Sequence, residues 1–166
     1  MRVRPPIELT RHDVTVRFEW TGDRYRHDIL IGGNVVARSI EGGPQDDVPP
    51  SPPLQDLSRE HLGGDVMAIM GVGGAGRGHW SISVTASERG LLFELACRGS
   101  VPNLTSRYER VGEVAIDPLP TATVDRRGEE LVLSPVERLV GTSVWSYEVG
   151  DCRSLSRKDE LSGAAS

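Results

Sequence analysis

The chain has 166 residues, a length that favours one domain. It contains 24 acidic and 19 basic side chains for a net charge of −5, and its 19 glycines and 11 prolines indicate a folded body with long loops rather than a disordered chain. The longest apolar runs, such as Val66 to Met70, are far shorter than the ~20 residues of a membrane-spanning helix, and no signal-peptide pattern follows Met1. We therefore expect a soluble cytoplasmic protein with no membrane partner.

The net charge is concentrated in residues 41–65. This segment carries six acidic side chains and only one basic one, whereas the rest of the chain is balanced. Nucleic-acid-binding proteins usually present a basic stripe with interleaved aromatic residues, because phosphate neutralisation supplies much of the affinity. Here the basic residues are scattered and the aromatic residues are three Trp, three Tyr and two Phe, so no nucleic-acid partner is predicted.

Alternation of apolar and polar residues begins at Val14 and continues to Trp20, a period of two that is typical of a half-buried strand. The pattern stops at residues 21–23 and resumes over 24–31, so the two runs predict a hairpin. A further strand over 35–40 follows a Gly-Gly-Asn turn. Three sequential strands with short turns form a meander.

Five of the eleven prolines lie in residues 41–65, which predicts an acidic, proline-rich loop. Within it, a capping Ser51, two prolines, apolar residues at 54, 57 and 62, and a terminal Gly-Gly pair predict one short helix near 54–62 that covers an end of the sheet. Because loop-closure entropy depends weakly on loop length, we expect deletion of residues 43–53 to leave folding nearly intact.

Further short strands are predicted at regular intervals along the rest of the chain. They cover residues 66–70, 79–86, 91–97, 108–116, 121–124, 130–133 and 142–149. Many short strands with turn residues between them indicate an all-β, mainly antiparallel single domain over 1–153, meander-rich and either a β-barrel or a sandwich, with a polar C-terminal tail over 154–166. A calycin-like barrel is the preferred form, with an apolar interior whose mouth is gated by residues 41–65 and 71–79.

The segment Gly71 to Gly76 matches the G-x-G-x-x-G pattern. This pattern binds a dinucleotide only where its last glycine opens a helix, because the helix N-terminus holds the pyrophosphate. Alternating β-branched residues follow here, so we expect a glycine-rich hairpin loop and no cofactor. Arg77 and His79 flank this loop and make it the first candidate for contact with an anionic ligand.

The remaining motifs give no catalytic or metal site. The four histidines lack the His or Cys neighbours at metal-ligand spacing, and no nucleophile elbow or Ser-x-x-Lys pattern occurs. Cys97 and Cys152 have the pattern of small buried side chains, and their redox state stays open. Glu94 would line a cavity if the sheet closed with its polar face inward.

These observations favour a non-enzymatic module that binds a small apolar or anionic ligand or another molecule. Its ligand-binding candidates are Arg77, His79, Trp80 and Glu94. One alternative is a hydrolase or isomerase with a pocket assembled from separate strands, and with His79 or Glu94 as the base. A deep pocket with several titratable groups of shifted pKa would favour that enzyme. A second alternative is a structural or homo-oligomerising domain that pairs through an edge strand.

Overall fold

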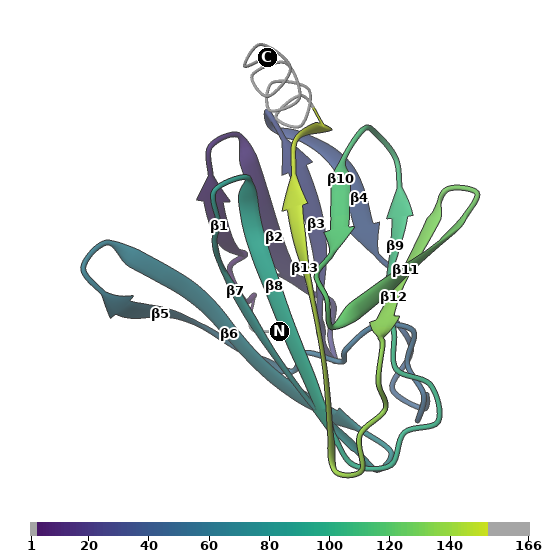
Figure 1. The fold of residues 1–166 in the computed structure, drawn as a ribbon. Helices are drawn as coiled ribbons and strands as arrows, with labels where there is room; N and C mark the ends of the chain where they lie inside the picture. The colour runs from purple at the N-terminus through teal and green to yellow at the C-terminus, as the bar shows by residue number, and fades with distance from the viewer. Residues whose placement is uncertain (1–2, 153–166) are drawn as a thin grey trace.

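The alternating segments form two antiparallel sheets in the computed structural model, which describes residues 3–152 (Figure 1). In spatial order, the seven strands of sheet A are β1 (Ile7–Arg11), β2 (Val14–Trp20), β3 (Tyr25–Ile31), β4 (Asn34–Ser39), β9 (Ser106–Arg110), β12 (Glu130–Pro135) and β11 (Ala122–Arg127). The six strands of sheet B are β10 (Ala115–Pro118), β13 (Thr142–Gly150), β8 (Gly90–Arg98), β7 (Gly78–Ala86), β6 (Val66–Ala75) and β5 (Asp56–Gly63).

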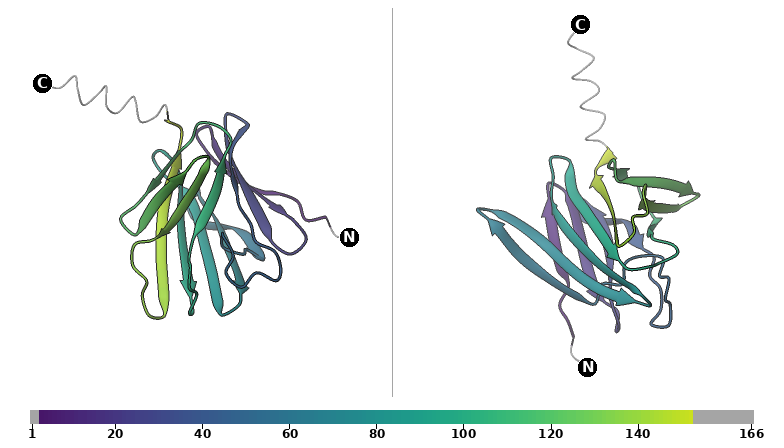
Figure 2. Two further views of the ribbon diagram at one scale, coloured as in Figure 1. Left: turned by 90° about the vertical axis from the view of Figure 1, so that its right-hand side faces the viewer. Right: turned by 60° about the horizontal axis from the view of Figure 1, so that its bottom comes forward.

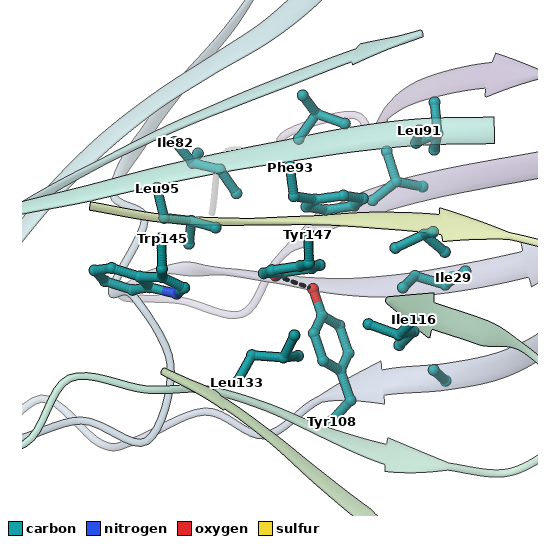
Figure 3. Packing of buried hydrophobic residues seen from close by; sticks show 14 of the residues in the cluster. Ile29, Ile82, Leu91, Phe93, Leu95, Tyr108, Ile116, Leu133, Trp145 and Tyr147 are labelled. Atoms are coloured by element: carbon teal, nitrogen blue, oxygen red, sulfur yellow. Dashed lines mark hydrogen bonds between the residues drawn. The ribbon is translucent and has the colours of Figure 1, made fainter. Parts of the chain in front are cut away.

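The inward faces of the two sheets share one hydrophobic core. Phe18 and Ile29 of sheet A and Phe93, Trp145 and Tyr147 of sheet B are all fully buried in it. Figure 3 shows how side chains from the two sheets meet there, with the Phe93 and Tyr147 rings stacked at a centroid distance of 5.2 Å. Two sheets that bury their apolar faces against each other form a β-sandwich.

The prediction of an all-β, antiparallel fold with a β2–β3–β4 meander is confirmed. The preference for a closed barrel is wrong, because the strand pairs among residues 3–152 form two open sheets. The chain passes from one sheet to the other several times instead of continuing one sheet to closure. The β5–β6 hairpin also projects away from the body, so β5 ends sheet B rather than pairing with sheet A (Figures 1 and 2).

The predicted helix near 54–62 is strand β5 in the structure. Residues 56–63 pair antiparallel with β6, from Asp56 opposite Val72 to Gly63 opposite Val66. The apolar positions that suggested a helical stripe have separate environments: Leu54 is buried and forms a bridge with Tyr25, whereas Leu62 is 56% exposed. Tertiary pairing with β6 therefore overrides the local helix pattern.

The predicted glycine-rich loop is also mostly strand, because β6 continues through Ala75 and only the turn at residues 76–77 separates it from β7. A Cβ atom at Gly73 would overlap the Pro53 carbonyl, and one at Gly71 would overlap the Leu57 side chain. These glycines therefore allow residues 53–57 to cross close against β6.

The proline-rich loop is partly core. Residues 43–48 are largely exposed, but Ser51, Pro52 and Leu54 are buried at one end of the sandwich. The Ser51 hydroxyl donates to the Arg107 carbonyl at 3.2 Å and accepts from the Arg107 amide at 3.0 Å. Removal of residues 43–53 would delete the buried Ser51 and Pro52 and both hydrogen bonds to Arg107. We therefore expect the deletion to destabilise the fold, in contrast to the expectation based on loop length.

The predicted polar tail over 154–166 lies outside the described residues. Among residues 3–152 there is no helix of the length and apolar character needed to cross a membrane.

Candidate ligand-binding groove

The outer face of sheet B is built from small side chains at its centre. On β7 and β8 the large residues, such as Ile82 and Leu95, point into the core, so alternation places Ser81, Ser83 and Ala96 outside. Larger apolar residues that point outward, such as Met70 and Val144, lie on the neighbouring strands β6 and β13. A face with small residues at its centre and larger ones at its sides is hollow along the middle.

The strand register aligns these residues into three cross-strand rows. The rows are Ser58–Met70–Ser83–Glu94–Ser146, Asp56–Val72–Ser81–Ala96–Val144 and Gly74–His79–Arg98–Thr142. A hollow of about 610 Å³ lies over the first two rows, and a second of about 720 Å³ lies over the second and third. We call the two together the outer groove. Each hollow is in the size range of ligand sites, about 300–1,000 Å³.

Apolar side chains form the two walls of the outer groove. Met70 and Val72, on the projecting β5–β6 hairpin, are 41% and 54% exposed. On the other side Val144 is 45% exposed, and a smaller hollow of about 260 Å³ beside it is lined by Val136 and Leu139. Exposed apolar patches with polar neighbours often mark binding surfaces.

Three of the four predicted ligand-binding residues line the groove, although one of them is almost fully buried. Glu94 and His79 are both exposed and lie on its surface. Trp80 is 3% exposed because its ring packs into the core beneath the groove floor. Arg77 lies in the β6–β7 turn, outside the residues that line the groove. Because Ser83 lies opposite Glu94 and four residues from His79, the Glu94 and His79 backbones are about 13 Å apart along the sheet.

Sequence reasoning missed Arg98, Asp56 and the apolar walls. The sequence does contain one signal for the hollow, which is the pair Ser81 and Ser83 between large apolar residues. Arg98 ends an alternating run, and Asp56 was assigned to a helix. Only the pairing register places them on one face with Glu94.

The charged side chains of the outer groove are unpaired within the described part of the chain. Among residues 3–152, the side chains of Asp56, Glu94, His79 and Arg98 take part in no ion pair or hydrogen bond. On the outer face of sheet A, by contrast, four pairs of opposite charges join neighbouring strands. These pairs are Glu8–Arg17, Glu19–Arg26, Asp28–Arg38 and Arg107–Glu130.

A separate polar cluster lies in the core. The His27 Nε2 atom and the Tyr108 hydroxyl are 2.7 Å apart, and the Tyr108 hydroxyl is 2.7 Å from that of Tyr147 (Figure 3 draws the second contact). Burial lowers the pKa of His27 to about 3 and raises the pKa of Tyr108 well above its usual value. The adjoining cavity has a volume of about 10 Å³, about the space of one water molecule.

Glu41 lies close to this cluster. Its Oε1 atom accepts a hydrogen bond of 2.7 Å from the Ser39 hydroxyl, and the Ser39 oxygen accepts one of 2.9 Å from the His27 amide. Burial raises the pKa of Glu41 to about 7, although Ser39 and Arg24 favour its charged form. No group of three or more potential metal-ligating side chains occurs in the described part of the chain.

The fold and the site define a two-sheet antiparallel β-sandwich with an open groove across one outer face. Comparison with models of known protein families, with curated proteins and with solved structures found no match.

Proposed function

We propose that this protein is a non-enzymatic binding module whose outer groove on sheet B holds a ligand. The observation that carries the proposal is a contrast between the two outer faces. Four cross-strand ion pairs lie on sheet A, whereas the groove leaves Glu94 and Arg98 unpaired beside a hollow with apolar walls. Unpaired charges and small hydroxyl side chains are the few polar groups that fix a ligand between apolar contacts.

Two arrangements favour binding over the hydrolase or isomerase alternative. Glu94 and His79 are about 13 Å apart along the sheet, too far for one to orient the other or share its proton. Of the titratable groups with strongly shifted pKa, His27 and Tyr108 adjoin a core cavity of about 10 Å³, and Glu41 does not line the groove. That volume admits no substrate larger than water.

The proposed compartment is the cytoplasm, with no nucleic-acid or membrane partner. Cys97 and Cys152 are both free thiols, which agrees with a reducing environment. Carboxylates of Asp56 and Glu94 at the groove would also repel a phosphate backbone.

The test is a screen of small-molecule fragments by amide NMR shifts on the whole 166-residue chain. We expect binding fragments to shift amides of β6, β7, β8 and β13, and we expect Ser83→Trp, which fills the floor, to abolish these shifts. Thr123→Trp, at an exposed position of β11 on the other sheet, is the matched control and should retain them. Fragment shifts confined to other surfaces, or unchanged in Ser83→Trp, would contradict the proposal.

A further inference from the structure

We infer that the occupant of the outer groove is an extended peptide segment with a basic side chain and, four residues away, an acidic group. This inference rests on the proposed function, because it names the ligand class of the same groove. It follows from the spacing of the unpaired charges, the shape of the groove and the chemistry of its floor and walls.

The charges of the groove are separated along one strand. Glu94 and Arg98 lie four residues apart on β8 and point to the same outer face, and His79 is directly opposite Arg98. Four residues of strand span about 13 Å. An extended peptide that follows β8 has nearly the same rise per residue, so groups at positions i and i+4 reach the two charges together. A basic side chain suits Glu94, and an acidic side chain suits Arg98 with His79.

The floor and walls suit a peptide backbone with apolar neighbours. The hydroxyls of Ser81 and Ser83 can donate to peptide carbonyls, and those of Ser81, Ser83 and Ser146 can accept from peptide amides. Met70 and Val72 on one wall and Val144 on the other contact intervening side chains, and methionine adapts to different shapes. The two hollows adjoin each other along β7 and β8, so a chain can pass through both.

Two other polymers fit the groove less well. Sugar rings usually stack on exposed aromatic side chains, but Trp80 and Trp145, below the floor, are 3% and 0% exposed. A nucleic acid would place phosphates near the carboxylates of Asp56 and Glu94. The groove surface therefore selects a chain of mixed charge with aliphatic side chains.

The test uses synthetic heptapeptides that are acetylated and amidated, so that only side chains carry charge. The first has Lys at position 2 and Asp at position 6 among Val and Ser residues, the second has the same residues with Lys and Asp adjacent, and the third has two Asp at positions 2 and 6. By isothermal titration calorimetry, we expect the first peptide to bind up to about fivefold more tightly than the other two, since each of those can form only one of the two exposed ion pairs.

A charge reversal in the groove should change the preferred peptide. Glu94→Lys places a second cation in line with Arg98, so this variant should prefer the Asp–Asp peptide. Glu109→Lys, an exposed position of β9 on sheet A, should keep the wild-type order. Circular dichroism of each variant checks that folding is unchanged. A milder variant, Glu94→Gln, changes the surface charge less and should lose the preference for the Lys–Asp peptide.

The outcomes separate this inference from the proposed function. Equal affinity for the three peptides, with all binding blocked by Ser83→Trp, would overturn the peptide-charge inference and leave the groove as a binding site. An absence of peptide binding, together with fragment shifts at the groove, would overturn the inference and retain a small-molecule site. A dimeric mass with groove amides protected in the dimer would show that a second copy occupies the groove, and would also overturn it.

Discussion

Residues with the same chemistry have different roles in this protein because their surroundings differ. Glu94 is exposed on the groove floor, where water stabilises its unpaired charge. Glu41 has a carboxyl oxygen shielded from solvent and without a hydrogen-bond partner, so its charged form is disfavoured. Glu94 is available to a ligand, whereas Glu41 links stability to pH.

Glu41 should make the protein less stable as the pH rises. Its pKa is about 7 in the folded state and near 4.5 when exposed, so the folded state retains the proton more strongly. This contribution to stability is fully present below pH 4.5 and is lost as the pH rises through 7. Urea unfolding at pH 5 and pH 8 measures this loss in the free energy of unfolding. The loss between the two pH values should be smaller in Glu41→Gln than in the wild type by up to about 3 kcal/mol.

The comparison of wild type with Glu41→Gln isolates this residue from His27. The pKa of His27 is lowered in the folded state, so its contribution is lost as the pH falls from 6.5 towards 3, the opposite direction. Both proteins share that effect. An identical pH dependence in the two proteins would show that the Glu41 carboxyl is solvated in the folded state.

At the scale of elements, strands with strict alternation were predictable and strands made by tertiary pairing were not. The β2–β3 hairpin follows from apolar residues at every second position. Strand β5 was missed because nearly all of it is exposed, so it lacks a buried stripe of period two. The run predicted over 108–116 is divided into β9 and β10, because the amides of Val111 and Gly112 turn aside to donate to the Val36 carbonyl.

The candidate site was predictable only in part for a similar reason. Residue type and strand position were enough to select His79 and Glu94, both of which lie at the groove. Trp80 also lines the groove, but adjacent residues in a strand point to opposite faces, so its ring packs into the core and is 3% exposed. Arg98 reaches the groove because β8 pairs with β7 and places it opposite His79. Strand pairing is a long-range property that the local sequence pattern does not give.

Gly73 should be far less tolerant of substitution than Gly74. A Cβ atom at Gly73 would overlap the backbone of Pro53, which cannot move without displacing the segment that leads into β5. A Cβ atom at Gly74 would lie 3.4 Å from its nearest neighbour, the Gly78 carbonyl oxygen. Gly73→Ala should therefore lower the free energy of unfolding by about 1–3 kcal/mol or more, as overpacking does, and Gly74→Ala by much less.

Thermal and urea unfolding of the two variants measure this difference. Equal stabilities would mean that residues 53–57 are not held against β6. Because β5 carries Asp56 and Ser58 to the edge of the groove, Gly73→Ala should also weaken any ligand binding that depends on the β5 side, and Gly74→Ala should preserve it.

At the scale of the whole molecule, an open sandwich leaves strand edges that must not pair with other copies. One edge of sheet B is β5, whose central residues Arg59, Glu60 and His61 are charged or polar and exposed; the other is the four-residue strand β10. Its pairing with β6 also shifts register between His61 and Gly63. Charged side chains and bulges are common features of edge strands that avoid association. These features favour a monomer over the oligomerising alternative.

The double variant Arg59→Val with Glu60→Val should convert β5 into an edge that pairs with other molecules. It places two β-branched apolar residues between the exposed Leu62 and the half-buried Leu57, so the strand loses its charged interruption. Multi-angle light scattering over a range of concentrations should show a monomer for the wild type and growing mass for the variant. The matched control is Arg126→Val with Arg127→Val on edge strand β11. It tests whether loss of charge at any edge strand is sufficient to cause association. A wild-type dimer that persists on dilution would instead assign β5 to an interface between copies, and the charges at Arg59 and Glu60 would then be expected to specify that pairing.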